Sequence, residues 1–381
     1  MSSNRKYGKG DARGSQPAGG TGERRIERKR ATLKDVAKAV GVHVSTVSRA
    51  LNPATRHLIT DGIAKRILDA SEKLSYRPNP AAYSLRTNRS NTIGIIVPDI
   101  TNSIFPPMIR GLEDVLSPHG YAALVVNTDL NREREAAAIS TLSARGVDGI
   151  AVASAEREDA ALSALAAQGT PVVTMNRRTD DAAVSSVISD EIAGVQQVLR
   201  HLVGLGHRRI ATIAGSQNLS TGQRRYDAFL RNSVEMGLQI GPGQVRFADA
   251  FNEAEGRRCM EQLLASANDC TAVLCANDRL AIGAIAALRA RGLRCPQDMS
   301  VTGFNDMAMA DCIDPPLTTV RIPHYDLGQA AARFLLERMN RAMNRALPQH
   351  QVLPVELAVR ASTAAPGQQI AAAVSPVRVV R

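Results

Sequence analysis

The sequence predicts two structural parts, a small all-α unit followed by an α/β core of two lobes with doubly wound parallel sheets. Three observations support this fold class. Two short amphipathic stretches flank a glycine near the N-terminus, short apolar strands alternate with helices after residue 91, and the positive charge is confined to the first quarter of the chain. A chain of 381 residues is also too long for one ordinary domain.

The all-α unit is predicted from apolar periodicity around Gly41. Apolar residues recur at helical spacing over residues 33–40 and again over 44–51. Glycine between them permits the positive φ that a sharp turn requires. A third helix is expected over residues 61–74, ending before Pro78 because the residue before a proline avoids the helical region. This pattern predicts a helix-turn-helix unit.

The second of these helices carries a distinctive outer face. With Val47 turned inward, short polar side chains such as Ser45 and Ser48, together with Arg49, project outward. Such side chains at the exposed start of a helix suit base edges and phosphates in a DNA major groove. The same helical shape also occurs in domains that bind no DNA.

The net charge of +11 is unevenly distributed. Residues 1–30 carry 9 Lys/Arg against 3 Asp/Glu, residues 31–91 carry 10 against 4, and the remaining 290 residues carry 28 against 29. A basic first quarter on a neutral body predicts a polyanionic partner for that quarter alone. Residues 1–30 lack apolar periodicity and are expected to be a disordered basic arm, and residues 364–381 a disordered tail.

The core is predicted from the alternation of short apolar strands with helices. This pattern is typical of parallel sheets covered on both faces, and roughly nine strands suit two lobes better than one. The expected strands are Ile93–Val97, Ala122–Val126, Gly149–Ala153, Pro171–Met175, Val184–Ile188, Arg209–Ala214, Ala272–Cys275, Ser300–Phe304 and Leu317–Val320. The expected helices include Met108–Leu116, Arg132–Ala144, Ala193–Leu205 and Leu280–Arg291.

Residues 32–52 read TLKDVAKAVGVHVSTVSRALN, which resembles the N-terminal signature of the LacI/GalR (lactose-repressor) family closely. Further matching motifs include YRPN at 76–79, LGHRRI at 205–210, AND at 276–278 and GFND at 303–306. The resemblance spans most of residues 31–363. It implies a DNA-binding transcriptional regulator, a repressor, whose core resembles periplasmic binding proteins and senses a small molecule.

The resemblance also implies a division into domains. It places the helix-turn-helix at 31–78, a hinge helix or linker at 79–91, and the sensing domain at 92–363. Within that domain the chain is expected to cross between lobes three times. The expected lobes are 92–176 plus 323–347, and 177–322 plus 348–363.

Sites on DNA follow from the same motifs. By motif position Val44, Ser45 and Arg49 read bases, while Thr46 and Ser48 contact phosphates or pack. Leu85 stands where the family's hinge wedges open a central base step in the minor groove, the alternative being a small helix packed on the next domain. The full set of expected DNA-binding residues is Thr32, Val44, Ser45, Thr46, Ser48, Arg49, Asn52, Tyr76, Asn79, Ala82 and Leu85.

A ligand site is expected in the cleft between the lobes. The resemblance places Arg225 where the family keeps an arginine for ligand oxygens, the alternative being a surface arginine. Many sugar-binding members carry aspartate at the position of Asn305, so the loss of that charge beside Arg225 favours an anionic effector over a neutral sugar. The expected effector-binding residues are Asn102, Ile104, Phe105, Arg225, Phe251, Asn277 and Asn305.

Other classes of protein fit the sequence less well. No hydrolase elbow, P-loop, metalloprotease motif or paired catalytic carboxylates is present, so the chain is not expected to be an enzyme. The five cysteines lack metal-binding spacing, and neither a metal nor a cofactor is expected. The absence of an apolar signal-peptide core or membrane span predicts a cytoplasmic protein. A secreted binding protein and a nucleoid-packing protein remain the alternative classes.

The expected partners are operator DNA, a small-molecule effector and a second copy of the chain. The effector is expected to be a sugar, a sugar acid or a phosphorylated sugar. The family includes dimers and tetramers, and the tail at 364–381 shows no leucine heptad. A homodimer on a palindromic operator is therefore favoured, with a tetramer as the alternative.

Overall fold

The computed structural model describes residues 31–52, 55–77, 89–266, 269–340 and 347–367. The chain divides into two compact units, Met1–Ala82 and Tyr83–Arg381. The predicted basic arm, residues 79–88 of the predicted hinge and residues 368–381 of the tail lie outside the described residues.

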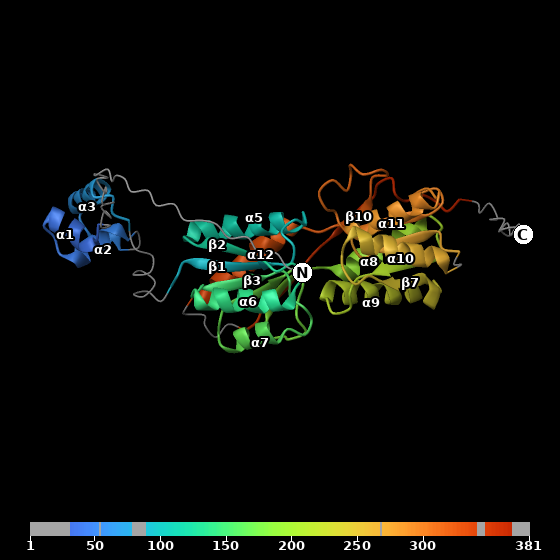
Figure 1. The fold of residues 1–381 in the computed structure, drawn as a ribbon, viewed down its shortest axis with the longest axis horizontal. Helices are drawn as coiled ribbons and strands as arrows, with labels where there is room; N and C mark the ends of the chain where they lie inside the picture. Colours follow the sequence, from blue (N-terminus) through green and yellow to red (C-terminus); the bar gives the residue numbers. More distant parts are fainter. Residues whose placement is uncertain (1–30, 53–54, 78–88, 267–268, 341–346, 368–381) are drawn as a thin grey trace, which may run out of the picture. The chain divides into compact units, whose positions relative to one another are not determined.

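The first unit is the predicted helix-turn-helix (Figure 1). Its helices are α1 (Leu33–Val40), α2 (Val44–Leu51) and α3 (Asp61–Lys73), with a short 3-10 turn, η1 (Arg56–Leu58), before α3. Gly41 ends α1 with a φ of 72°, the left-handed conformation that the turn requires. Val36, Val47 and Ile67, one from each helix, are fully buried and close a small shared core.

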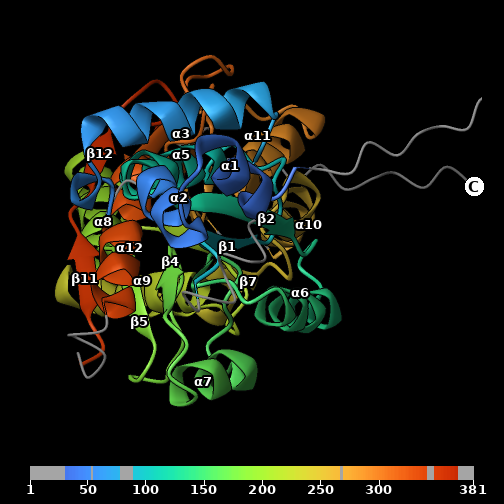
Figure 2. The ribbon, with the colours of Figure 1, turned by 90° about the vertical axis from the view of Figure 1, so that its left-hand side faces the viewer.

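The first lobe of the second unit is a parallel sheet in the order β11-β5-β4-β3-β1-β2. Helices α5 and α12 cover one face and α6 and α7 the other (Figure 2), and the buried residues form a separate cluster on each face. The bounds are β1 (Thr92–Val97), α5 (Phe105–Leu116), η2 (Ser117–His119), β2 (Ala122–Asn127), α6 (Arg132–Ala144), β3 (Gly149–Val152), α7 (Ala160–Ala167), β4 (Val172–Met175), β5 (Ser185–Ser189), α12 (His324–Met339) and β11 (His350–Leu353).

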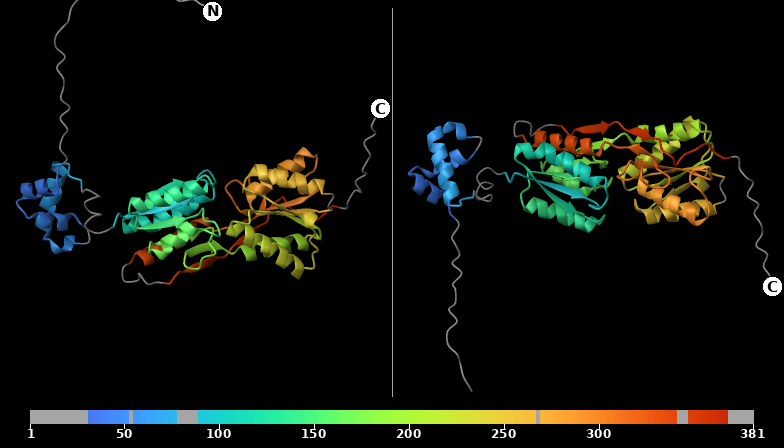
Figure 3. Two further views of the ribbon diagram at one scale, coloured as in Figure 1. Left: turned by 60° about the horizontal axis from the view of Figure 1, so that its bottom comes forward. Right: turned by 90° about the horizontal axis from the view of Figure 1, so that it is seen from above.

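The second lobe is a sheet in the order β12-β10-β9-β8-β6-β7, parallel except for β12. Helices α8 and α9 pack on one face, and α10 and α11 on the other (Figure 3). The bounds are α8 (Glu191–Gly204), β6 (Ile210–Ala214), α9 (Ser220–Glu235), η3 (Pro242–Gln244), β7 (Val245–Phe247), α10 (Glu253–Ala265), β8 (Ala272–Cys275), α11 (Asp278–Ala290), β9 (Ser300–Asn305), β10 (Thr318–Arg321) and β12 (Glu356–Ala358).

The chain crosses between the lobes between β5 and α8, between β10 and α12, and between β11 and β12. Two of the predicted lobe boundaries are therefore wrong, since β5 and β11 belong to the first sheet and were assigned to the second lobe. Strand pairing decides their place: Val173 of β4 pairs with Ser185, and Ser186 pairs with His350. The strand at β5 was predicted, but the sheet that it joins depends on pairing with residues distant in sequence, and β11 is an exposed edge strand with little apolar pattern.

The ends of the core also differ from the predicted boundaries. The backbone N–H groups of Ser90 and Asn91, which were assigned to the hinge, donate to the Asp148 carboxylate at 3.0 and 2.7 Å. At the other end, the Ala364 carbonyl lies 2.8 Å from His207 Nε2. Both segments are therefore tied to the core. Within the described ranges no helix is long and apolar enough to cross a membrane.

Candidate functional site

The outer face of α2 presents the residues that were expected to contact DNA. Val47 and Ala50 point into the core of the unit, whereas Ser45 and Arg49 are exposed and Thr46 and Ser48 are partly exposed. Val44 is partly buried and packs against the same core, so part of its surface is already in use. This arrangement gives α2 a short polar surface with one cation, as major-groove reading requires.

The start of α2 is fixed by His43, the residue before it. The Nδ1 atom of His43 accepts from the Ser45 N–H at 3.3 Å and lies 2.8 Å from the Ser45 hydroxyl oxygen. His43 is therefore the N-cap of α2. The Ser45 hydroxyl is held against this cap, and a base contact must share or replace that bond.

The other expected DNA-binding residues lie at helix ends. The N–H and hydroxyl of Thr32 both donate to Asp35 Oδ2, at 2.8 and 2.7 Å, which fixes the start of α1. Asn52 follows α2 as its C-cap, and Tyr76 packs against the core of the unit, where burial raises its pKa. Asn79, Ala82 and Leu85 lie outside the described residues. That these residues contact DNA remains a prediction.

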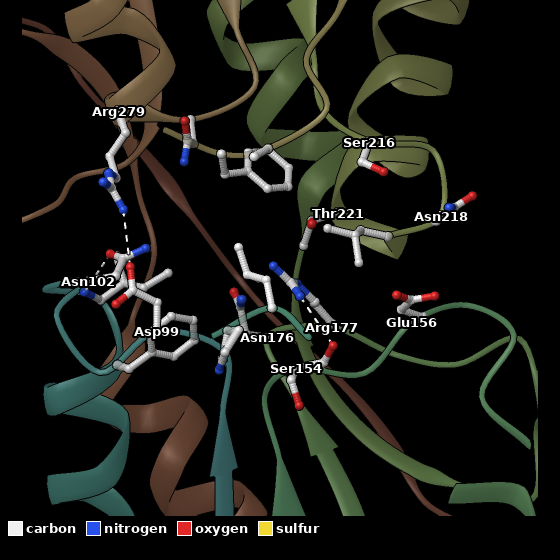
Figure 4. Close-up of a pocket in the computed structure, with 18 of the residues that line it drawn as sticks. Asp99, Asn102, Ser154, Glu156, Asn176, Arg177, Ser216, Asn218, Thr221 and Arg279 are labelled. Atoms are coloured by element: carbon white, nitrogen blue, oxygen red, sulfur yellow. Dashed lines mark hydrogen bonds and ion pairs between the residues drawn. The ribbon is translucent and has the colours of Figure 1, made fainter. Parts of the chain in front are cut away.

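A cavity of about 260 Å³ lies in the second unit and is lined by residues of both lobes. Its walls are the segments that follow the carboxyl ends of parallel strands, where open α/β sheets hold their ligands. Figure 4 shows Asp99, Ser154 and Asn176 from the first lobe facing Ser216 and Thr221 from the second. All the residues expected to bind the effector line this cavity: Asn102, Ile104, Phe105, Arg225, Phe251, Asn277 and Asn305. Their contact with an effector remains a prediction.

Arg225 on α9 is only 3% exposed and is held from two sides. Its Nη1 donates to the Ala276 carbonyl at 2.6 Å, and its guanidinium carbon lies 3.8 Å from the centre of the Phe304 ring. Its Nε has no hydrogen-bond partner. Burial lowers the pKa of Arg225 to about 10, so it stays protonated at neutral pH.

A second buried arginine, Arg177, was missed by the sequence analysis. It is 6% exposed, donates from Nη1 to the Ser154 carbonyl at 3.2 Å, and leaves its Nε without a partner (Figure 4). Burial lowers its pKa to about 10 as well. Its position directly after β4 was the available signal, since ligand contacts cluster at such strand ends. Asn176, between β4 and Arg177, has a φ of 65°, and Asn305 has a φ of 123°, so two cavity residues hold unusual backbone conformations.

The first lobe also contributes a carboxyl group that the sequence analysis did not single out. Glu135 on α6 lines the cavity, and its buried Oε1 has no partner. Burial raises its pKa to about 7, with the negative charge of Asp159 adding to the effect. The side-chain amide oxygen of Asn176, Oδ1, is also buried and lacks a partner. Unpartnered buried polar atoms are rare in proteins, so their concentration around one cavity points to a ligand site.

The remaining charges around the cavity are largely paired. On α11, Arg279 Nε lies 2.8 Å from Glu253 Oε1, and its Nη1 lies 3.3 Å from Asp99 Oδ2. Arg132 Nη2 lies 2.6 Å from Glu156 Oε2. Asn277 caps α11 through its bond from the Leu280 N–H at 2.9 Å, as its position before a helix indicates. In the described ranges, no cluster of His, Cys, Asp or Glu could hold a metal ion, and all five cysteines are free thiols.

Parts of both units match known protein families. Residues 32–79 match the model of bacterial regulatory proteins of the lacI family, and residues 199–363 match a periplasmic binding protein-like domain. The chain is 35% identical to the HTH-type transcriptional regulator RegA of Clostridium saccharobutylicum over 81% of its own length and 93% of RegA. It is 30% identical to the HTH-type transcriptional repressor CytR of Escherichia coli strain K12, over 88% of this chain and 97% of CytR.

Two solved structures extend the comparison. A lac repressor dimer bound to operator and the anti-inducer ONPF matches with a TM-score of 0.78 and 28% identity, covering 88% of this chain and all of that one. The transcriptional regulator CelR, in complex with cellobiose, matches with a TM-score of 0.67 and 29% identity, covering 87% of this chain and all of CelR. The chain is therefore a DNA-binding transcriptional regulator of the LacI family with a periplasmic-binding-protein-like effector domain, and not an enzyme.

Proposed function

We propose that the chain is a repressor that binds a palindromic operator as a homodimer and changes its DNA affinity when a small molecule occupies the cavity. The observation that carries this proposal is the combination, in one chain, of an exposed polar recognition helix and a cavity with unpartnered polar groups from both lobes. The relatives CytR, a repressor, and the lac repressor, a dimer on its operator, support it. CelR with bound cellobiose supports a carbohydrate-like effector.

DNA recognition is assigned to α2 and to the hinge. Arg49 and Ser45 are exposed on α2 and can reach base edges, while Val44 can meet a thymine methyl group. Two units in a dimer would meet two half-sites about one helical turn apart. We assign Leu85 as the wedge in the minor groove between the half-sites. A protein that works on operator DNA acts in the cytoplasm.

Control by the effector follows from the position of the cavity. A ligand there contacts both lobes at once, so it binds the closed arrangement more tightly than an open one. A change in the relative orientation of the lobes would then alter DNA affinity through the hinge. By linkage, whatever the ligand does to DNA affinity, DNA does equally to ligand affinity.

The direct test is selection of DNA sites from a random pool by the purified full-length chain. The proposal expects a palindromic consensus, and gel shifts at fixed salt should favour it over scrambled DNA by at least about a thousandfold. Sedimentation of the complex should give two chains per site. Equal affinity for both DNAs would instead indicate a packing protein and would refute the proposal.

A further inference from the structure

The cap of α2 fixes the protonation of its histidine. His43, the N-cap residue, and Ser45, in the first turn of the helix, are both exposed. The Ser45 N–H donates to His43 Nδ1 at 3.3 Å, so this ring nitrogen presents a lone pair and carries no proton. We therefore assign the proton of the neutral imidazole ring to Nε2.

This assignment decides which partner donates in the second bond between the two residues. His43 Nδ1 and Ser45 Oγ lie 2.8 Å apart, a normal hydrogen-bond distance. Because Nδ1 carries no proton, the Ser45 hydroxyl donates and Nδ1 accepts. Breaking this bond to turn the hydroxyl elsewhere is disfavoured by about two- to tenfold. A hydroxyl has one proton and two lone pairs, so Ser45 keeps only its acceptor capacity for a partner outside the protein.

Base edges in the DNA major groove differ in the same property. Adenine and cytosine present an exocyclic amino group, which donates, whereas guanine and thymine present a carbonyl oxygen at the matching position, which accepts. Ser45, as an acceptor, therefore fits the amino group of adenine or cytosine. Arg49, exposed on the same face four residues later, has the opposite polarity, because a guanidinium group only donates. The exposed face of α2 thus offers one acceptor and one donor group to neighbouring base edges.

From this geometry we propose that His43 determines the specificity of Ser45: by accepting the hydroxyl proton, it makes Ser45 a reader of the amino group of adenine or cytosine in the operator. His43 is a positioning residue that acts through Ser45. The inference rests on the proposed function, because it requires α2 to read an operator in the major groove, but it can fail while that function holds.

The first measurement finds the base pair that Ser45 reads. The full-length chain and its variant S45A each select sites from a random DNA pool, and the half-site base pair at which S45A loses preference is identified. The amino group of that base pair is then removed with deoxynebularine in place of deoxyadenosine, or deoxyzebularine in place of deoxycytidine. In gel shifts at fixed salt the wild-type chain should lose about three- to tenfold in affinity. S45A should lose less than about twofold, which controls for the altered DNA.

Variants of the histidine test its role in this preference. H43G removes the ring acceptor but keeps a residue that is tolerated at an N-cap, so α2 should still form. Exchanging adenine for guanine, or cytosine for thymine, puts a carbonyl oxygen where the amino group was, and should cost the wild-type chain at least about fivefold. H43G should lose less than about twofold, because its free hydroxyl can turn and donate to that oxygen. H57A, at an exposed histidine of η1 in the same unit, is the matched control and should discriminate as the wild-type chain does.

The outcomes separate the inference from the proposed function. If S45A changes no base preference, if the wild-type chain binds equally well without the amino group, or if H43G keeps the wild-type discrimination, the inference is wrong and operator binding still stands. A general loss of affinity on all DNAs in H43G, with unchanged discrimination, would show that His43 only caps the helix. If no palindromic consensus emerges from the pool, the proposed function itself fails.

Discussion

Arg279 Nη1 lies 3.3 Å from Asp99 Oδ2, and this ion pair joins the two lobes beside the cavity (Figure 4). Asp99 follows β1 in the first lobe, and Arg279 lies in the first turn of α11 in the second. Arg279 also pairs with Glu253 in its own lobe, at 2.8 Å. We call this ion pair the latch, because it connects the lobes in the arrangement seen here, and Glu253 holds Arg279 from its own lobe.

The first prediction concerns this latch. D99N removes the pair between lobes and should increase the population of the open arrangement by about two- to fivefold, because a partly exposed ion pair contributes about 0.5–1 kcal/mol. Hydrogen exchange of the backbone amides at 99–105 should become faster by the same factor. E261Q, which removes the exposed pair between Arg257 and Glu261 within the second lobe, is the control, and equal exchange in the two variants would contradict the latch.

The latch should also depend on pH in a defined direction. Burial would raise the pKa of Asp99, but hydrogen bonds from Thr101 and the charge of Arg279 outweigh it and hold the pKa below its usual value. A carboxyl whose pKa is depressed contributes its stabilisation above the unfolded pKa and loses it as the pH falls through the folded one. The protection factors of the amides at 99–105, which are corrected for the intrinsic pH dependence of exchange, should therefore stay constant from pH 8 to about 5 and fall only in more acidic solution.

Glu135 predicts the opposite pH dependence. Its pKa of about 7 lies above that of an unfolded glutamate, so its effect on stability is favourable at low pH and is lost as the pH rises towards 7. E135Q should therefore raise the free energy of unfolding by about 1–2 kcal/mol at pH 8 and change it little at pH 4.5. Urea unfolding at both pH values measures this. Glu133, exposed on the same helix, gives the control variant E133Q, and equal effects of the two variants would show that burial is not the cause.

A substitution at Gly222 shows how tightly the loop after β6 packs on α9. A Cβ there would lie 2.1 Å from the Ser216 carbonyl oxygen, so G222A should destabilise the core by about 1–3 kcal/mol. G204A places a methyl group on the exposed end of α8, where no atom lies within 4 Å, and should be neutral or stabilising by less than about 1 kcal/mol. Thermal unfolding of the two variants compares them, and similar losses would mean that the close approach is not the cause.

A substitution at Arg49 shows whether α2 reads the bases of the operator. R49A removes an exposed cation without touching the core of the unit, so specific operator affinity should fall by about ten- to a hundredfold while binding to random DNA falls much less. Lys65, exposed on α3, gives the matched charge control K65A. If both variants lose affinity equally on both DNAs, Arg49 contributes only charge.

A substitution at Leu85 shows whether this residue wedges open the minor groove, a role that rests on sequence resemblance alone. L85A should weaken binding to the selected operator by more than tenfold and leave binding to random DNA within about twofold, because only a specific complex would be wedged open. Gel shifts on the two DNAs measure this. Equal losses of affinity for the two DNAs would show that Leu85 does not act as a wedge.

The sequence by itself determined the helix-turn-helix and the alternation of strands and helices. These features depend on local pattern: Gly41 marks the turn, Val36 and Val47 mark the inner face, and apolar runs such as 272–275 mark strands within a residue or two. The family resemblance also identified seven residues that line the cavity, because ligand contacts in such folds follow the ends of strands.

Only the tertiary structure decided which sheet β5 and β11 join, and which charges around the cavity are satisfied. Strand pairing depends on partners distant in sequence, as Ser186 and His350 show. Arg177, Arg225 and Arg279 cannot be told apart in the sequence, yet folding pairs Arg279 with two carboxylates and buries the other two with Nε atoms that have no hydrogen-bond partner. Whether an ionisable side chain is paired depends on distances between atoms that are far apart in sequence, and only the packed chain fixes these distances.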